Sequence, residues 1–253
     1  NSFSSIVKFN FKNDNSLALK YNFYSVAPSY NTLLHSSNYE NYNWDNEFDN
    51  SVTNSISLNL ILSNILDLDI DLISVKKHVQ FEKLIGNNSA GINNYSIIPI
   101  QYSNNLEVLK IKLARKIKFG KFSIDSKLLL QKTMSDNIIN LPEIVSRNSF
   151  YYSTDMFKKA LYLQTGLGVK YFSKFYMNGY DPLLSELYVQ NEKEIGGFPI
   201  IDFFINAKIQ QTRLYFKFEH FNSSFTGYNY YSAPNYPYRD FTFRFGLVWN
   251  FFM

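Results

Sequence analysis

The sequence contains no cysteine, so no disulfide can hold the fold together. It also contains no run of about 18 or more apolar residues, which excludes a transmembrane helix. No serine stands in a nucleophile-elbow context, and neither an H-E-x-x-H motif nor a glycine-rich phosphate loop occurs. We therefore expect the chain not to be an enzyme and to use no metal or cofactor.

The excess of one sign of charge is also small. The sequence has 25 Lys and Arg residues and 21 Asp and Glu residues, which gives a net charge of +4. So small an excess, without a basic cluster interleaved with aromatics, does not predict nucleic-acid binding. Aromatic residues are abundant at 18%, with 24 Phe and 20 Tyr but only 2 Trp. This enrichment fits either the girdles of a membrane barrel or a soluble β-rich core with tyrosine-rich loops.

The end of the chain carries the clearest pattern. Residues 241–252 read F-T-F-R-F-G-L-V-W-N-F-F, with an apolar side chain at every second position. A period of two is typical of a β-strand, since successive side chains point to opposite faces. A face made almost wholly of aromatics predicts a strand with one side in lipid and the other facing a wet interior.

Similar alternation recurs in about eleven segments, and the connections between them are alternately short and long. We expect tight turns near residues 13–15, 63–64, 120, 153–155 and 211, and long segments at 27–50, 79–104, 173–199 and 222–240. Tight periplasmic turns and long outer loops are typical of outer-membrane barrels. The predicted fold is all-β: a transmembrane, antiparallel, up-and-down β-barrel that forms one domain over residues 1–253, with a periplasmic C-terminus.

An odd strand number conflicts with closure, since closed antiparallel bacterial barrels have an even number of strands. An unpaired edge in lipid would leave backbone groups unsatisfied, each at a cost of roughly several kcal/mol. Either the count is wrong by one, or at least one strand lies upstream of Asn1, which we favour. We expect about 12 to 14 strands in the complete barrel, with about 11 in this chain. The chain would then be a mature form or a fragment of a longer protein.

The alternation assigns side chains to two faces of the barrel wall. The charged residues that we expect to line the lumen are Asp67, Asp69, Asp71, Lys110, Lys112, Lys116, Lys118, Asp125, Lys127, Lys217 and Arg244. The apolar residues that we expect to contact lipid are Leu214, Phe216, Phe218, Phe243, Phe245, Leu247, Trp249 and Phe251.

The aspartates at 67, 69 and 71 form a D-x-D-x-D pattern, which also opens a calcium-binding EF-hand loop. That loop needs glycine at its sixth position, where this chain has Leu72, so a strand is the better interpretation. If the lysines of 110–118 lie on the neighbouring strand, Asp67 should lie near Lys118 and Asp71 near Lys112. Such pairs fit either an ion-selective pore wall or ordinary salt bridges in a solvated interior.

The three histidines form no recognisable motif. His35 falls in a loop, and His78 falls near a strand end. His220 shares the parity of Phe218, so we expect it on the outward face near the outer end of its strand.

The C-terminal half resembles a family of outer-membrane β-barrels from Bacteroidetes-type Gram-negative bacteria that are described as putative porins. The resemblance is carried by the segments 157–166, 186–192, 198–209, 219–225 and 232–252. Members of that family are longer than 253 residues, which agrees with the strand-parity argument. Many such barrels end on an aromatic residue, whereas this chain ends on Met253, so the insertion signal is shifted by one position.

The resemblance implies a barrel in the outer membrane of a Gram-negative bacterium, in contact with lipid and lipopolysaccharide. The first functional hypothesis is a passive diffusion channel for small polar solutes. The alternative is a structural or accessory barrel with a plugged lumen, in a larger complex for secretion, uptake or barrel assembly, bound to other outer-membrane proteins or lipoproteins. The conformation of the long loops should discriminate between the two.

Overall fold

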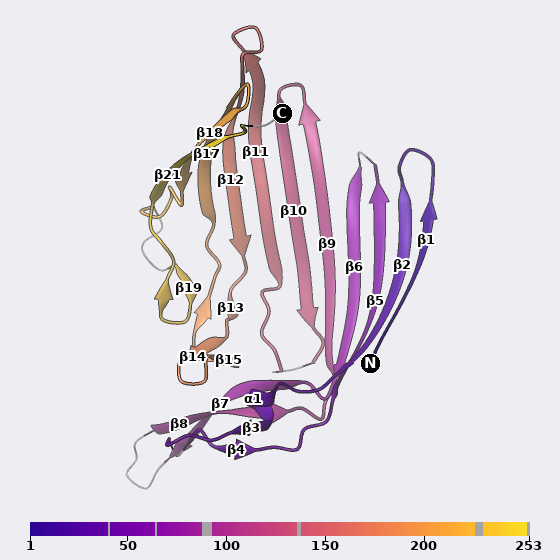
Figure 1. Ribbon diagram of the computed structural model, residues 1–253, viewed down its shortest axis with the longest axis vertical. Coiled ribbons are helices and arrows are strands. Elements are labelled where there is room, and N and C mark those ends of the chain that lie inside the picture. Colours follow the sequence, from indigo (N-terminus) through magenta and orange to yellow (C-terminus); the bar gives the residue numbers. More distant parts are fainter. Residues whose placement is uncertain (40, 64, 88–92, 136–137, 226–229, 252–253) are drawn as a thin grey trace.

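Eleven strands pair in chain order to form one antiparallel sheet, which Figure 1 shows as a single curved wall. The computed structural model describes all residues except 40, 64, 88–92, 136–137, 226–229 and 252–253. The strands of the wall are β1 (Ser2–Asn10), β2 (Ser16–Val26), β5 (Ser51–Leu62), β6 (Leu66–Lys76), β9 (Leu106–Phe119), β10 (Phe122–Thr133), β11 (Ile144–Met156), β12 (Leu161–Phe172), β17 (Ile200–Ile209), β18 (Thr212–Glu219) and β21 (Thr242–Trp249). The predicted all-β class and the predicted eleven strands are confirmed.

The wall has two chemically different faces, because residues directly opposite each other on paired strands share a face. The polar face contains Asp69 and its partner Lys112. The apolar face contains Phe216 and its partner Phe245. Large apolar side chains on the apolar face are strongly exposed; Phe245 is 73% and Leu247 60% accessible. No second layer therefore covers this end of the apolar face among the described residues.

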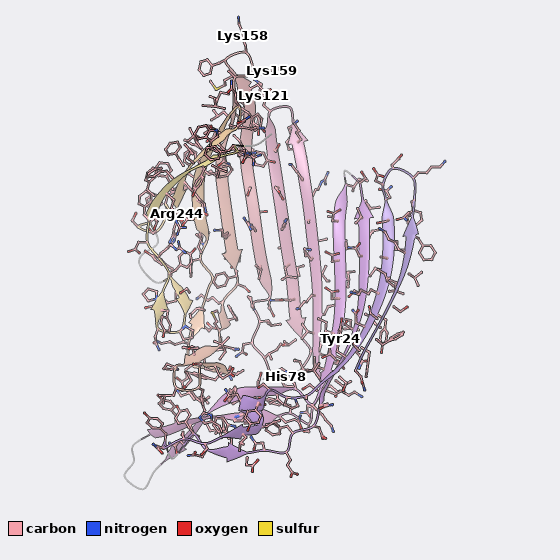
Figure 2. All side chains as sticks on the ribbon, viewed as in Figure 1. Tyr24, His78, Lys121, Lys158, Lys159 and Arg244 are labelled. Atoms are coloured by element: carbon pink, nitrogen blue, oxygen red, sulfur yellow. The ribbon has the colours of Figure 1, made fainter. Side chains whose placement is uncertain are left out.

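The short turns lie at one end of the wall and the long loops at the other. In Figure 2, Lys121, Lys158 and Lys159 mark the end with the short turns, whereas Tyr24 and His78 lie near the end with the long loops. The turn predicted at 153–155 is wrong. β11 continues to Met156 because Ser153 and Asp155 extend the alternation, and the chain reverses at 157–160, where φ is positive at Phe157, Lys158 and Lys159.

The two outermost strands of the wall, β1 and β21, are each paired on one side only among the described residues. The final strand is shorter than predicted: it ends at Trp249, and Phe251 follows it with its ring stacked on that of Trp249 at 4.6 Å. The expectation of a strand upstream of Asn1, and of about 12 to 14 strands in all, stays a prediction.

The long connections fold into small elements that lie across the end of the wall (Figure 1). These are α1 (Tyr30–Leu33), β3 (Leu34–His35), β4 (Trp44–Asp45), β7 (Val79–Asn87), β8 (Asn93–Gln101), β13 (Phe175–Tyr176), β14 (Gly179–Asp181), β15 (Glu186–Val189), β16 (Glu194–Ile195), β19 (Tyr231–Ala233) and β20 (Tyr236–Pro237). Among the described residues, no helix has the length and apolar character that a membrane crossing requires.

Candidate functional site

The strand pairing brings the charged residues predicted for the lumen onto one face. All of them lie on the polar face. This follows from the register of the paired strands, traced from β6 through β9, β10, β11, β12, β17 and β18 to β21. The predicted lipid-facing residues of β18 and β21 fall on the opposite face, as the direct pairs Leu214 with Leu247, Phe216 with Phe245 and Phe218 with Phe243 show. The two sets are therefore segregated, although they are spread over strands far apart in sequence.

The predicted register between the aspartate and lysine strands is wrong. Asp67 lies opposite Ala114, Asp69 opposite Lys112, and Asp71 opposite Lys110. The reason is stagger: β9 extends to Phe119, past the start of β6 at Leu66, because neighbouring strands of a tilted wall are offset along their axes.

One aspartate of this row forms a salt bridge. The Lys112 Nζ lies 3.0 Å from a carboxylate oxygen of Asp69, and the Asn59 amide donates to the other oxygen. Lys116 lies opposite Asp125 of β10, and Lys118 lies opposite Ser123. The aspartates thus follow one strand of the wall, and among the described residues no group of three or more potential metal ligands forms.

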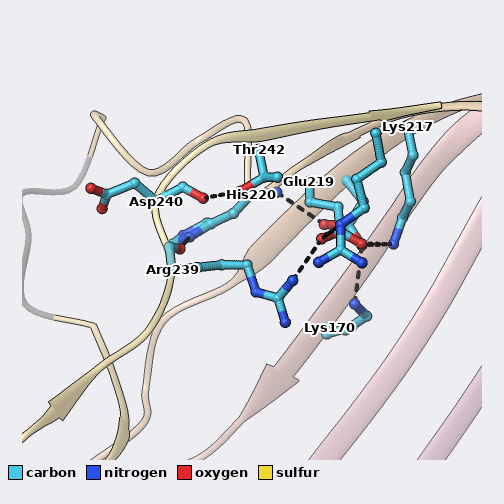
Figure 3. A network of polar contacts seen from close by, with 9 residues as sticks. Lys170, Lys217, Glu219, His220, Arg239, Asp240 and Thr242 are labelled. Atoms are coloured by element: carbon cyan, nitrogen blue, oxygen red, sulfur yellow. Dashed lines mark hydrogen bonds and ion pairs between the residues drawn. The ribbon is translucent and has the colours of Figure 1, made fainter.

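A denser charged cluster, not singled out from the sequence, connects the last strands of the wall (Figure 3). Asp202 of β17 is only 4% exposed, and both Lys170 Nζ and Lys217 Nζ contact its carboxylate, at 3.0 and 3.1 Å. Glu219 accepts from Lys217 at 2.8 Å, and both Arg239 and Arg244 contact it, at 3.2 and 3.1 Å. Of these residues only Lys217 and Arg244 were predicted for the site.

His220 is buried next to this cluster and bonds to Asp202 through its backbone. The prediction that it lies on the outward face is therefore wrong. Its side chain is buried with 1% exposure, and its backbone N–H donates to Asp202 Oδ1 at 3.0 Å. Its Nδ1 lies 2.8 Å from the Arg239 carbonyl oxygen, and the rings of Tyr230 and Tyr238 meet it edge-on. A positive φ of 51° at His220 ends the strand alternation, so parity no longer predicts where its ring points.

The long loops pack on one another at the end of the wall. We call the described residues of 27–50, 77–105, 134–143 and 173–199 the cap. Its main sheet has the order β14-β15-β7-β8, in which the parallel pair β15–β7 joins two loops distant in sequence. Further contacts between loops are Asn31 to Glu186 at 3.0 Å, Tyr42 to Asp181 at 2.9 Å, Lys83 to Glu192 at 2.6 Å and Asn140 to the Gln190 carbonyl at 3.1 Å.

The cap also has a small hydrophobic core. Phe81, Ile97 and Leu184 are buried together, and Tyr42, Trp44 and Tyr188 pack around them. Asp181, 5% exposed, accepts the backbone N–H groups of Leu183 and Leu184, both at 2.9 Å. The cap is therefore a packed structure rather than a set of independent loops. Composition did not reveal this core, because its buried residues come from loops far apart in the sequence.

A segregated polar and apolar wall with short turns at one end suits a membrane barrel, and comparison with known families agrees. Residues 1–253 match the family described as "Putative porin". The chain belongs to this family. The family resemblance inferred from the C-terminal half is thereby confirmed over the whole chain.

Solved structures show the same fold at low sequence identity. The siderophore receptor PirA from Acinetobacter baumannii is 11% identical, with a TM-score of 0.57 over 97% of this chain and 40% of that chain. A point mutant of the ferric enterobactin receptor PfeA from Pseudomonas aeruginosa, in complex with enterobactin, is 11% identical, with a TM-score of 0.64 over 97% and 40%. The copper transporter OprC is 12% identical, with a TM-score of 0.62 over 96% and 38%.

These solved structures show the fold of the porin-family chain. The chain spans about two fifths of the length of these matched proteins. No curated protein matches it. Family membership and the barrel fold place the chain in an outer membrane, as a porin-type β-barrel wall.

Proposed function

We propose that the chain forms the wall of a passive outer-membrane channel for small polar solutes, with the polar face toward the lumen. The observation that carries the proposal is the segregation of the charged residues from the aromatic residues across the strands β6 to β21. A water-filled pore through lipid needs this arrangement, because the lipid side must be apolar and the lumen polar. Exposed rings such as those of Phe243 and Phe245 would be unfavourable in water, and lipid chains would cover them.

The distribution of loops supports the proposed orientation in the membrane. The short turns and the C-terminus would be periplasmic, and the cap would lie on the outer side, where barrels of this type carry their long loops. Lipid and lipopolysaccharide would contact the apolar face of a Gram-negative outer membrane. The wall would need no catalytic group, cofactor or metal, and no nucleic acid would bind it.

The cap favours a second candidate, a structural or accessory barrel within a larger outer-membrane complex. Loops that pack into a core across the end of the wall would narrow or close the mouth, and their outer side would offer other outer-membrane proteins or lipoproteins a surface. In that case the lumen would be plugged and would not conduct.

Planar-bilayer conductance of the full-length protein, purified from native membranes in mild detergent, discriminates between the two. Stable unitary steps are expected for the channel. A folded protein that stays silent, especially with co-purifying subunits, would contradict the channel and support the plugged barrel.

A further inference from the structure

Three basic residues lie in a row across the polar face where β10, β11 and β12 run side by side. Lys127 is directly opposite Arg147, and Arg147 is directly opposite Lys170. Like charges in direct opposition destabilise a sheet. A row of this kind therefore needs a compensating negative charge, from the protein or from a ligand.

Within the part of the chain that the structure describes, a carboxylate contacts only one member of the row. Asp202 contacts Lys170, but its carboxylate is also held by Lys217 and by the His220 N–H group, and it is 4% exposed. Among the described residues, neither Lys127 nor Arg147 forms a salt bridge. Asp125, two residues from Lys127 on the same strand, lies opposite Lys116 rather than Arg147.

A recess of about 140 Å³ opens beside Arg147 and is also bordered by Ser149, Gly168, Lys170, Asp202 and Lys217. Gly168 leaves its floor without a side chain; a Cβ placed there would have its nearest heavy atom, the Asp202 Cβ, 4.0 Å away. The recess therefore has space next to an excess of positive charge. Its one bordering carboxylate, Asp202, is already bound by Lys170, Lys217 and the His220 N–H group.

The polar face as a whole has the same excess of positive charge. In the wall strands its basic residues outnumber its acidic ones: Lys8, Lys20, Lys110, Lys112, Lys116, Lys118, Lys127, Arg147, Lys170, Lys208, Arg213, Lys217 and Arg244 against Asp67, Asp69, Asp71, Asp125, Asp155, Asp202 and Glu219. A surface with this balance attracts anions toward the recess before they reach it.

We propose that this recess, which we name the oxyanion site, binds the phosphate or carboxylate group of a small solute. The planar fork of Arg147 donates hydrogen bonds to two oxygens of that group. Lys170, which borders the recess, adds a point charge, and Lys127 adds a second one from outside the border, on the strand next to Arg147. The inference rests on the proposed function, since the polar face must border the solute pathway, and it specifies anionic solutes as the preferred class.

The test is equilibrium dialysis of radiolabelled inorganic phosphate against the full-length protein in detergent. Saturable binding is expected, weakened roughly tenfold by Arg147→Gln and by Lys127→Gln, and weakened less by Arg147→Lys, which keeps the charge but loses the fork. Lys158→Gln, in the turn at the far end of the wall, is the matched control and should bind like the parent protein. A dicarboxylate such as succinate should compete. No saturable binding, or equal binding by Arg147→Gln, overturns the site.

This readout does not depend on conductance. Phosphate binding that requires Arg147, in a protein that is silent in bilayers, would refute the diffusion channel and keep the oxyanion site. Unitary conductance without phosphate binding would keep the channel and refute the site.

Discussion

At the scale of single residues, two glycines of β12 share the polar face but differ in the space above them. A Cβ at Gly166 would lie 2.2 Å from the Phe150 carbonyl oxygen and 2.6 Å from the Tyr151 Cα, both in the paired strand. A Cβ at Gly168 would meet nothing closer than 4.0 Å. Backbone atoms cannot move aside as a flexible side chain can, so β11 and β12 need glycine at position 166 in order to pair this closely.

Gly166→Ala should therefore destabilise the folded barrel by about 1–3 kcal/mol, the usual cost of overpacking. Gly168→Ala is the matched control and should fold normally. The measurement is the temperature at which the compact, heat-modifiable band disappears on a gel. Equal transition temperatures for the two variants would contradict the described packing of β11 on β12.

The direction of Phe216 gives a second prediction. Phe216 lies opposite Phe245 on the apolar face. An arginine on the lipid face near the bilayer midplane costs about 2–4 kcal/mol. Phe216→Arg should therefore impair insertion, seen as loss of the heat-modifiable form in reconstituted vesicles.

Asn206→Arg introduces the same side chain on the polar face of the adjacent strand, where Asn206 lies opposite Tyr215. It should insert like the parent chain. Equal tolerance of both arginines would show that the faces have been assigned wrongly.

At the scale of elements, one hydrogen bond joins two loops of the cap. The Tyr42 hydroxyl donates to Asp181 at 2.9 Å. Burial and the adjacent carboxylate raise the pKa of Tyr42 from 10.0 to about 12. The folded cap favours the protonated phenol, so the raised pKa of Tyr42 contributes to the stability of the cap. This contribution to stability is complete below pH 10 and is lost as the pH rises through about 12.

At neutral pH, Tyr42→Phe should lower the free energy of unfolding of the cap by about 1.5–3 kcal/mol, the range for a hydrogen bond to a charged group. The 173–199 segment should then be cleaved faster by a protease. Tyr39→Phe, at a position 58% exposed, is the control. The ultraviolet difference titration between parent and Tyr42→Phe should show one phenol that ionises near pH 12. Ionisation near pH 10 would mean that Tyr42 is not held by Asp181 in solution.

The elements also show what the sequence could predict. Alternation is local, so the strands and their two faces follow from residues such as Phe243, Arg244 and Phe245 alone. Register is not local, because it depends on the stagger between strands, and Asp71 was therefore paired with the wrong lysine. The cap was beyond prediction, since the partners Phe81 and Leu184 lie about a hundred residues apart in the sequence and no local pattern links them. The strand parity that holds at Phe218 fails at His220, where φ is positive.

At the scale of the whole molecule, the wall has a different solvent on each side in our account. The apolar face has too many exposed rings for water, and the polar face has too many charges for lipid. The cap and the oxyanion site then act in series, since a solute passing the cap would meet the basic row on the wall. The central claim is that the polar face lines a water-filled pathway.

Single-cysteine accessibility tests that claim most directly, because this chain contains no cysteine of its own. Asn206→Cys places a thiol on the polar face and Leu214→Cys places one on the apolar face of the neighbouring strand. In intact proteoliposomes, a charged, membrane-impermeant thiol reagent should label the first and reduce its conductance, and leave the second unlabelled. Labelling of Leu214→Cys with protection of Asn206→Cys would contradict the account.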